Sequence, residues 1–152
     1  MVVAGRSTMG QNYQTVSALL EEARKRLKRL SPVETQRAVR EGAVLIDIRS
    51  DVQRRVDGTI AEATYIPRNV LEWRCDPSSP HRDDRVARRD CLLLLICDEG
   101  DQSSLAAATL RRFGLQASDV IGGFQAWRAA GLPFDRPRSN RAPPSDSRSD
   151  DD

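Results

Sequence analysis

The sequence is poor in the residues that build metal sites and disulfide frameworks. Its 152 residues include three cysteines, Cys75, Cys91 and Cys97, and a single histidine, His81, with no Cys-x-x-Cys pair. An odd number of cysteines argues against a disulfide framework, and the scarcity of histidine argues against a zinc site. We therefore expect no metal and no other cofactor. The open question is whether one of the three cysteines is a reactive thiol.

Long apolar runs and a strong charge of one sign are also missing. No stretch approaches the length of about 20 apolar residues that a membrane helix needs. The start of the chain lacks the basic region and the apolar run of a secretory signal. The formal net charge of +2 gives no reason to expect nucleic acid or a membrane as partner. With 39% hydrophobic and 30% charged residues, the composition is that of a cytoplasmic globular protein, and the length favours one domain.

The first thirty residues divide into two parts. Residues 1–12 show no periodic pattern, and we expect them to be loose. From 13 to 30, apolar residues recur at helical spacing, which predicts an additional N-terminal helix packed on the domain surface. A helix at a membrane surface is the alternative, but Glu21 and Glu22 share its polar face. The recurring apolar residues are Val16, Leu19, Leu20, Ala23, Leu27 and Leu30.

The next segment carries a helix start. Residues 31–34 (Ser-Pro-Val-Glu) combine a serine cap, a proline at the first helical position and the glutamate of a capping box. We expect this helix to end before Gly42, a residue suited to a left-handed C-cap. The apolar residues 43–48 then predict a buried strand, followed by a short helix at 51–56.

Residues 91–96 give the strongest strand signal of the chain, because all of them are apolar. The run is too short for a buried helix and is typical of a central parallel strand covered on both faces. The polar, proline-marked segment 76–90 before it predicts a long surface connection. The other expected elements are an extended piece at 65–67, a helical turn at 70–74, a helix at 103–113 with Leu105, Thr109, Leu110 and Phe113 inward, a strand at 120–121 and a last helix at 123–130.

The alternation of strands and helices predicts the fold class. We expect an α/β domain over 13–134, with an open, mostly parallel sheet flanked by helices on both faces. Beyond Phe134 the sequence has no apolar content to bury, so residues 135–152 are expected to form a disordered tail.

Cys97 is the candidate nucleophile because of its position. It follows the strongest strand directly and precedes a helix expected to begin near Ser103. In open α/β sheets, ligands bind outside the carboxyl ends of the strands. Unpaired N–H groups at such a crossing and the positive end of the helix dipole favour an anion, including a thiolate. Cys91 and Cys75 are expected to be small buried side chains without a catalytic role.

Several short segments read as motifs. Residues 97–103 (Cys-Asp-Glu-Gly-Asp-Gln-Ser) precede Leu-Ala-Ala, and residues 122–127 read Gly-Gly-Phe-Gln-Ala-Trp. Residues 45–49 read Leu-Ile-Asp-Ile-Arg, and residues 58–60 read Gly-Thr-Ile. In order and spacing they resemble the rhodanese family's C-x-x-G-x-R-S loop, G-G-x-x-A-W segment, D-x-R strand and G-H-I motif. The resemblance runs from about residue 31 to 134 and implies a rhodanese-like fold.

The resemblance also implies the roles of the site residues. Cys97 would carry a persulfide, stabilised by the N–H groups of the loop that follows it. Asp47 and Arg49, at the end of a neighbouring strand, would support the loop or form a structural ion pair. Ser103 is equally a candidate helix cap. The loop residues are Asp98, Glu99, Gly100, Asp101, Gln102 and Ser103.

The chain departs from the family pattern at the positions that bind anions. Gln102 stands where the family has a loop arginine, and Gln53, Thr59 and residues 60–63 (Ile-Ala-Glu-Ala) replace other family residues. The nucleophile is retained. The length of the loop from Cys97 to Gln102 is that of the sulfurtransferases, whereas related dual-specificity phosphatases use one residue more and an arginine.

The function implied is that of a rhodanese-like sulfurtransferase or persulfide carrier. Sulfane sulfur would pass through Cys97, from a small-molecule or protein-bound donor to a thiol or other nucleophilic acceptor. Because the loop carries Asp98, Glu99 and Asp101 without an arginine, we expect weak activity with the thiosulfate dianion. The alternative is a catalytically quiet module that binds a protein partner or senses oxidants. A phosphatase or arsenate-type reductase is a third alternative.

Overall fold

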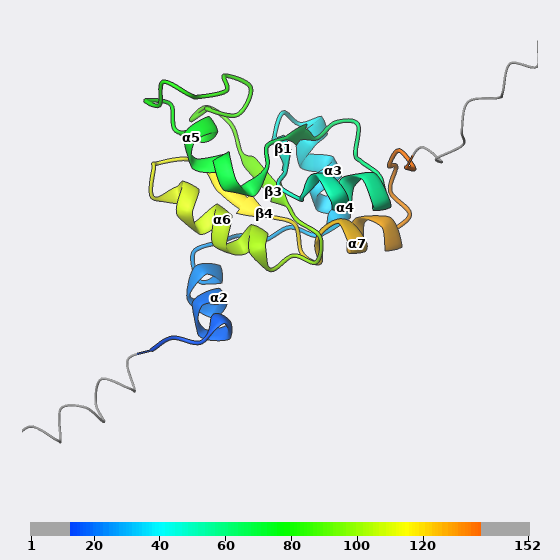
Figure 1. The fold of residues 1–152 in the computed structure, drawn as a ribbon, viewed down its shortest axis with the longest axis horizontal. Helices are drawn as coiled ribbons and strands as arrows, with labels where there is room; N and C mark the ends of the chain where they lie inside the picture. The colour runs from blue at the N-terminus through cyan, green and yellow to red at the C-terminus, as the bar shows by residue number, and fades with distance from the viewer. Residues whose placement is uncertain (1–12, 138–152) are drawn as a thin grey trace, which may run out of the picture.

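A four-stranded parallel sheet forms the centre of residues 13–137, the part of the chain that the computed structural model describes (Figure 1). Its order is β2-β1-β3-β4, and every pairing is parallel. The expectations for residues 1–12, and for 138–152 of the tail, lie outside the described residues. The strands are β1 (Val44–Asp47), β2 (Thr64–Tyr65), β3 (Leu93–Ile96) and β4 (Ala117–Asp119).

Helices cover both faces of this sheet, which confirms the predicted fold class. Helices α5 and α6 pack on one face, and α3 and α7 pack on the other (Figure 1). Helix α2 lies outside these layers, beside α6. Within residues 13–137, no helix combines the length and the apolar character needed to cross a membrane. The helices are α2 (Val16–Arg24), α3 (Pro32–Arg40), α4 (Asp51–Asp57), the 3₁₀ turn η1 (Arg68–Val70), α5 (Leu71–Cys75), α6 (Gln102–Arg111) and α7 (Gly123–Ala129).

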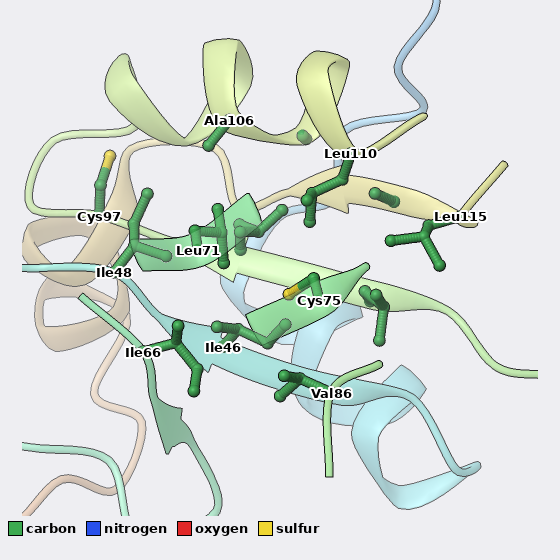
Figure 2. Close-up of a cluster of buried hydrophobic side chains, with 14 residues drawn as sticks. Ile46, Ile48, Ile66, Leu71, Cys75, Val86, Cys97, Ala106, Leu110 and Leu115 are labelled. Carbon is green, nitrogen blue, oxygen red and sulfur yellow. The ribbon is translucent and has the colours of Figure 1, made fainter. Parts of the chain in front are cut away.

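The central strand β3 shows why a continuous apolar run was needed. Leu93 and Leu95 point into the core under α5 and α6, and Leu94 and Ile96 point into the core under α7. All four are fully buried, and each contributes about 1.5–3 kcal/mol by leaving water. Figure 2 shows the first of these two cores, with Leu110 of α6 above the sheet. The strand predicted from the apolar run is confirmed.

Two capping boxes fix the starts of α3 and α4. Ser31 Oγ accepts the N–H of Glu34, and the Ser31 N–H donates to the Glu34 carboxylate, as predicted. These bonds also lower the pKa of Glu34. Ser50 and Gln53 repeat the arrangement at α4. Gln53 therefore has a structural role at one of the positions where the chain departs from the family pattern.

The N-terminal helix is shorter than the predicted span of 13–30. It ends at Arg24, and the chain then turns and becomes extended. Leu30 pairs with Val120 at the edge of the sheet. This residue therefore lies in an extended segment and not in a helix, and its side chain packs against the core under α7. Pairing with a distant segment overrides the local helical periodicity here.

Two further predictions need correction. The last strand is Ala117–Asp119 and not 120–121, because small side chains at an edge strand gave no apolar signal. On α6, Leu110 is buried as predicted, but the predicted Leu105 and Thr109 are half-buried and line the groove toward α2. The other α6 positions in the core are Ala106 and Ala107, whose small side chains let the helix approach the sheet closely.

Candidate active site

Cys97 lies at the carboxyl edge of the sheet, where the strand order reverses. The chain runs outward from β1 to β2 and then returns to β3 on the other side of β1. The loops after β1 and β3 therefore flank the crevice in which open α/β folds bind ligands. Cys97 follows β3 directly and is 4% exposed. Figure 2 shows it beside Ile48, with its sulfur turned toward the layer of α6.

Two backbone N–H groups point at the Cys97 sulfur. Gly100 N donates to it at 3.1 Å and Ser103 N at 3.3 Å. The thiol in turn donates to Ser103 Oγ at 3.3 Å. Within residues 13–137, no other N–H of the predicted loop makes a hydrogen bond to the sulfur. The loop thus offers two backbone donors that can hold an anion, fewer than the run of loop N–H groups expected from the sequence.

The double glycine brings α7 against this loop. A Cβ on Gly123, whose φ is +60°, would lie 2.5 Å from the carbonyl oxygen of Cys97. Without it, Phe124 N donates to the Cys97 carbonyl at 2.8 Å, and Gln125 N donates to the Asp98 carbonyl at 3.1 Å. The start of α7 therefore fixes the outward-facing peptide groups of the loop and leaves its N–H groups for the sulfur.

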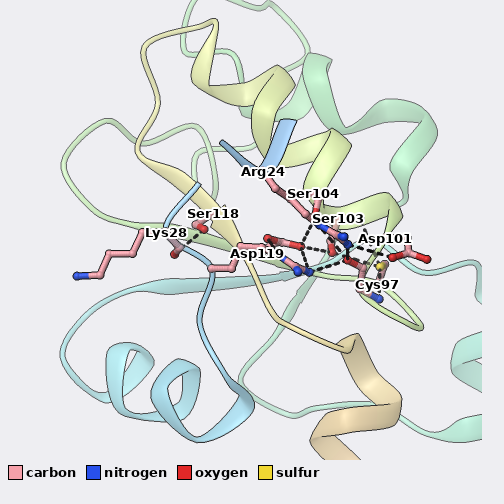
Figure 3. Close-up of polar contacts among 10 residues, drawn as sticks. Arg24, Lys28, Cys97, Asp101, Ser103, Ser104, Ser118 and Asp119 are labelled. Atoms are coloured by element: carbon pink, nitrogen blue, oxygen red, sulfur yellow. Dashed lines mark hydrogen bonds and ion pairs between the residues drawn. The ribbon is translucent and has the colours of Figure 1, made fainter. Parts of the chain in front are cut away.

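A buried carboxylate lies behind the loop (Figure 3). Asp119, at the end of β4, accepts the hydroxyl protons of Ser103 at 2.7 Å and Ser104 at 2.8 Å. Ser103 is not the cap of α6, because the helix begins at Gln102 and Asp101 occupies the N-cap position. Arg29 completes the group with an ion pair to Asp119 at 3.0 Å.

Sequence reasoning missed four members of this group. For Asp119 the sequence offered one signal, because it is a single carboxylate directly before the apolar residues 120–121 and the double glycine 122–123. The arginines gave none, because 24 of the residues are arginine or lysine and most of those within residues 13–137 are exposed. The missed residues are Arg29, Ser104, Asp119 and Arg24, whose Nε donates to Ser104 Oγ at 3.0 Å.

The three loop carboxylates differ in their surroundings. Asp98 accepts a hydrogen bond from the Gln125 amide at 2.9 Å. Asp101 forms an ion pair with Arg24 at 3.0 Å. Glu99 is exposed and makes no hydrogen bond or ion pair within the described part of the chain. Within residues 13–137, Glu99 is therefore the one loop carboxylate without a hydrogen-bond or ion-pair partner.

Asp47 and Arg49 form a buried ion pair at the end of β1. Arg49 Nε and Nη2 donate to the two Asp47 oxygens at 3.1 and 2.9 Å. Arg49 also donates to the carbonyl of Gly58 at 2.8 Å and lies over the ring of Phe124. These contacts join the loop after β1 to α7, and within residues 13–137 neither side chain makes a hydrogen bond to Cys97. The geometry favours structural support over direct catalysis.

The other cysteines have environments that hold the proton on sulfur. Burial, with smaller contributions from Glu72 and Asp83, raises the pKa of Cys75 to about 12. Cys91 is half-buried and not buried as predicted, and its partial burial also raises its pKa. All three cysteines are free thiols. Between residues 13 and 137, no group of three or more His, Cys, Asp or Glu side chains is arranged to hold a metal ion.

Comparison with known proteins identifies relatives along most of this domain. The family model described as "Rhodanese-like domain" matches residues 31–130. Thiosulfate sulfurtransferase GlpE of Pseudomonas entomophila is 35% identical over 103 residues, which cover 67% of this chain and 85% of that protein. The adenylyltransferase and sulfurtransferase MOCS3 of Oryza sativa subsp. japonica is 32% identical over 89 residues. That match covers 55% of this chain but spans only 20% of the rice protein.

Solved structures show the same fold. A Rhodopseudomonas palustris protein of unknown function, described as a possible tyrosine phosphatase, has a TM-score of 0.74 and is 31% identical, covering 80% of this chain and 95% of that one. A thiosulfate sulfurtransferase from Pseudomonas aeruginosa has a TM-score of 0.59 at 22% identity. It covers 75% of this chain and 20% of that one, and supports the fold alone.

Proposed function

Because the chain belongs to the rhodanese-like domain family, we propose that it is a sulfurtransferase or persulfide carrier that moves sulfane sulfur through Cys97. The observation that carries the proposal is the pair of N–H groups, from Gly100 and Ser103, that point at the Cys97 sulfur at 3.1 and 3.3 Å. Preorganised donors of this kind stabilise negative charge on the sulfur as it develops. The GlpE relatives, which are named thiosulfate sulfurtransferases, carry the same activity class.

The reaction has two displacement steps at sulfur. The Cys97 thiolate attacks the outer sulfur of a donor such as thiosulfate. A new S–S bond forms, and the donor's S–S bond breaks with its electron pair leaving on sulfite. A thiol or other nucleophilic acceptor then attacks the terminal sulfur of the persulfide, and the electron pair returns to Cys97 as thiolate. The loop donors hold the anion in both resting states.

The remaining predicted loop residues have lesser roles in this scheme. Asp98 and Asp101 are engaged by Gln125 and Arg24, which limits the negative charge they present to a donor. Glu99 and Gln102 are exposed and shape the charge at the entrance. Because no side chain from 98 to 102 is a cation, we propose weak use of thiosulfate and better use of a neutral or protein-bound persulfide.

A quiet binding module is the second candidate, favoured by the low exposure of Cys97, 4%; the same low exposure argues against redox sensing, which needs an accessible thiol. A thiol that is so covered reacts slowly unless the loop opens. Phosphatase chemistry, which the name of the Rhodopseudomonas relative raises, has less support. A phosphate needs a cation in the loop, and Gln102 stands at the position that would supply it.

Intact mass spectrometry of the full chain separates an enzyme from a quiet module. The protein is incubated with thiosulfate, with a small-molecule persulfide, and with buffer alone. We expect a gain of one sulfur atom that a thiol acceptor removes. Cys97→Ser should show no gain, because it keeps the size of the side chain but lacks the nucleophile. A sulfur gain that persists in Cys97→Ser, or no gain with either donor, would overturn the proposal.

We also propose the limits of the domain and its setting. The folded unit comprises the predicted span 13–134, so that α2 belongs to it, and also Asp135, which the prediction assigned to the tail. Asp135 still pairs with Thr59 through two backbone hydrogen bonds of 3.0 and 2.6 Å. A cytoplasmic setting fits the proposed chemistry, because a reducing compartment keeps the thiol available.

A further inference from the structure

Two arginines reach the cysteine loop from a part of the chain that precedes the matched family residues. Arg24 ends α2, and Arg29 lies between α2 and α3, whereas the family match begins at residue 31. The Nη2 atoms of both donate to the carbonyl oxygen of Gly100, at 3.0 and 2.8 Å. The N–H of the same Gly100 donates to the Cys97 sulfur. Two guanidinium groups therefore hold the residue that supplies one of the two backbone donors.

Arg29 also holds the buried carboxylate behind the loop. Its Nε and Nη2 lie 3.0 and 3.2 Å from the two oxygens of Asp119, whose side chain is fully buried. Asp119 accepts the hydroxyl proton of Ser103 at 2.7 Å, and Ser103 Oγ accepts the thiol proton of Cys97 at 3.3 Å. An unbroken chain of contacts thus connects Arg29 to the reactive sulfur.

The series of contacts from Arg29 to Cys97 responds to the charge on the sulfur, because Ser103 has a single hydroxyl proton. A hydroxyl carries one proton, which Ser103 gives to Asp119 while Cys97 is a thiol. A thiolate has no proton to donate, so the hydroxyl then lies between two anions. Arg29 stabilises Asp119 with charge-assisted hydrogen bonds that do not need the Ser103 proton. The hydroxyl is then free to turn toward the sulfur.

We propose that Arg29, assisted by Arg24, supplies the positive charge that the cysteine loop lacks and positions the donors on the sulfur of Cys97. Both are positioning residues, and the inference rests on the proposed function. Arg29 has the larger effect, because its side chain is 18% exposed and its partner is buried. Arg24 and its partner Asp101 are 32% and 66% exposed, so water and salt screen that pair.

The test compares Arg29→Gln with Arg26→Gln in the full chain. Arg26 is exposed, lies in the same segment and makes no hydrogen bond or ion pair within residues 13–137, so its substitution controls for net charge. One readout is the steady-state rate of sulfur transfer. The other is the rate at which iodoacetamide alkylates Cys97 across a range of pH, with the site located by peptide mass spectrometry.

We expect Arg29→Gln to lower kcat about ten- to hundredfold, as the loss of a charged hydrogen-bond partner does, and to change KM for the donor less. The alkylation profile should move to higher pH, because a lost cation disfavours the thiolate. Arg29→Lys keeps the charge but not the two-pronged geometry, so it should restore the profile and only part of kcat. Arg26→Gln should match the unmodified chain.

Agreement of Arg29→Gln with Arg26→Gln in both readouts would show that the proposal is wrong. Thermal melts check the fold of each variant. If Arg29→Gln does not fold, Arg29→Lys decides, and an unchanged kcat in that variant contradicts the positioning role. If the unmodified chain transfers no sulfur, the proposed function fails, but the alkylation profile still decides whether Arg29 acts on Cys97.

Discussion

Replacing Arg49 by methionine measures what the buried ion pair at the end of β1 contributes to the fold. Arg49 donates to Asp47 at 3.1 and 2.9 Å and to the carbonyl of Gly58 at 2.8 Å. Its guanidinium carbon lies 3.9 Å from the centre of the Phe124 ring. Methionine keeps much of the length of the stem and removes the charge and all three hydrogen bonds.

The expected loss of stability follows from the partners that remain. Removing one member of a buried ion pair costs about 3–5 kcal/mol. Arg54 stays 3.3 Å from Asp47 and offsets part of this, so we expect the lower end, about 3 kcal/mol. In a chain of this size each kcal/mol lowers the melting temperature by about 2–4 °C, which gives a drop of about 6–12 °C. Asp47→Ala should cost more, because it leaves Arg49 buried without any carboxylate.

Thermal melts and denaturant unfolding of the single variants and of the double variant Asp47→Ala/Arg49→Met provide the measurement. The double variant should lose less stability than the two single losses added together, because no unpaired charge is left behind by either change. Sulfur gain at Cys97 is measured below the melting temperature and should survive in Arg49→Met. A stable Arg49→Met that no longer takes up sulfur would refute the reasoning, since Arg49 would then act on the reaction and not on the fold.

Three other outcomes are expected. Gly123→Ala should slow sulfur transfer more than Gly131→Ala, since both glycines have positive φ but only at Gly123 would a Cβ meet the Cys97 carbonyl, at 2.5 Å; equal transfer rates in the two variants would contradict this. Gln102→Arg should raise turnover of thiosulfate but not of a neutral persulfide, with a gain that shrinks as salt rises, and a salt-independent gain would show that screening is not involved. Truncation after Pro137 should leave the melting temperature unchanged, whereas truncation after Phe134 removes the two Thr59–Asp135 hydrogen bonds and should cost about 1–3 kcal/mol by denaturant unfolding.

Local signals in the sequence were sufficient for the central strand of the sheet and for the place of Cys97. The capping box at Ser31 and the apolar run at 91–96 depend on neighbouring residues only, and both predictions are confirmed. Cys97 directly follows this run, so it lies at the carboxyl end of the strand. That is the edge of the sheet where open α/β folds bind ligands. The role of Cys97 as nucleophile stays a prediction.

Contacts between distant segments could not be predicted in the same way. Leu30 fits the helical periodicity of its neighbours, yet it pairs with Val120 in an extended backbone. Asp119 accepts from Ser103 and Arg29, which lie 16 and 90 residues away along the chain. A pattern of local apolar spacing carries no information about such partners, so the polar network behind the loop emerges only from the fold.

The departures of the loop from the family pattern have a physical explanation in this geometry. The sulfur of Cys97 is held by the N–H groups of Gly100 and Ser103, and a backbone donor does not depend on the side chain beside it. The feature that must be kept is the backbone conformation of the loop. The first N–H groups of α7 fix it through the carbonyls of Cys97 and Asp98, and the two arginines fix it through the carbonyl of Gly100. Side chains at the exposed positions can then change from cationic to neutral or acidic without moving the donors. If the proposed function holds, such changes alter which donor anion can approach Cys97 and leave the two N–H groups on its sulfur in place.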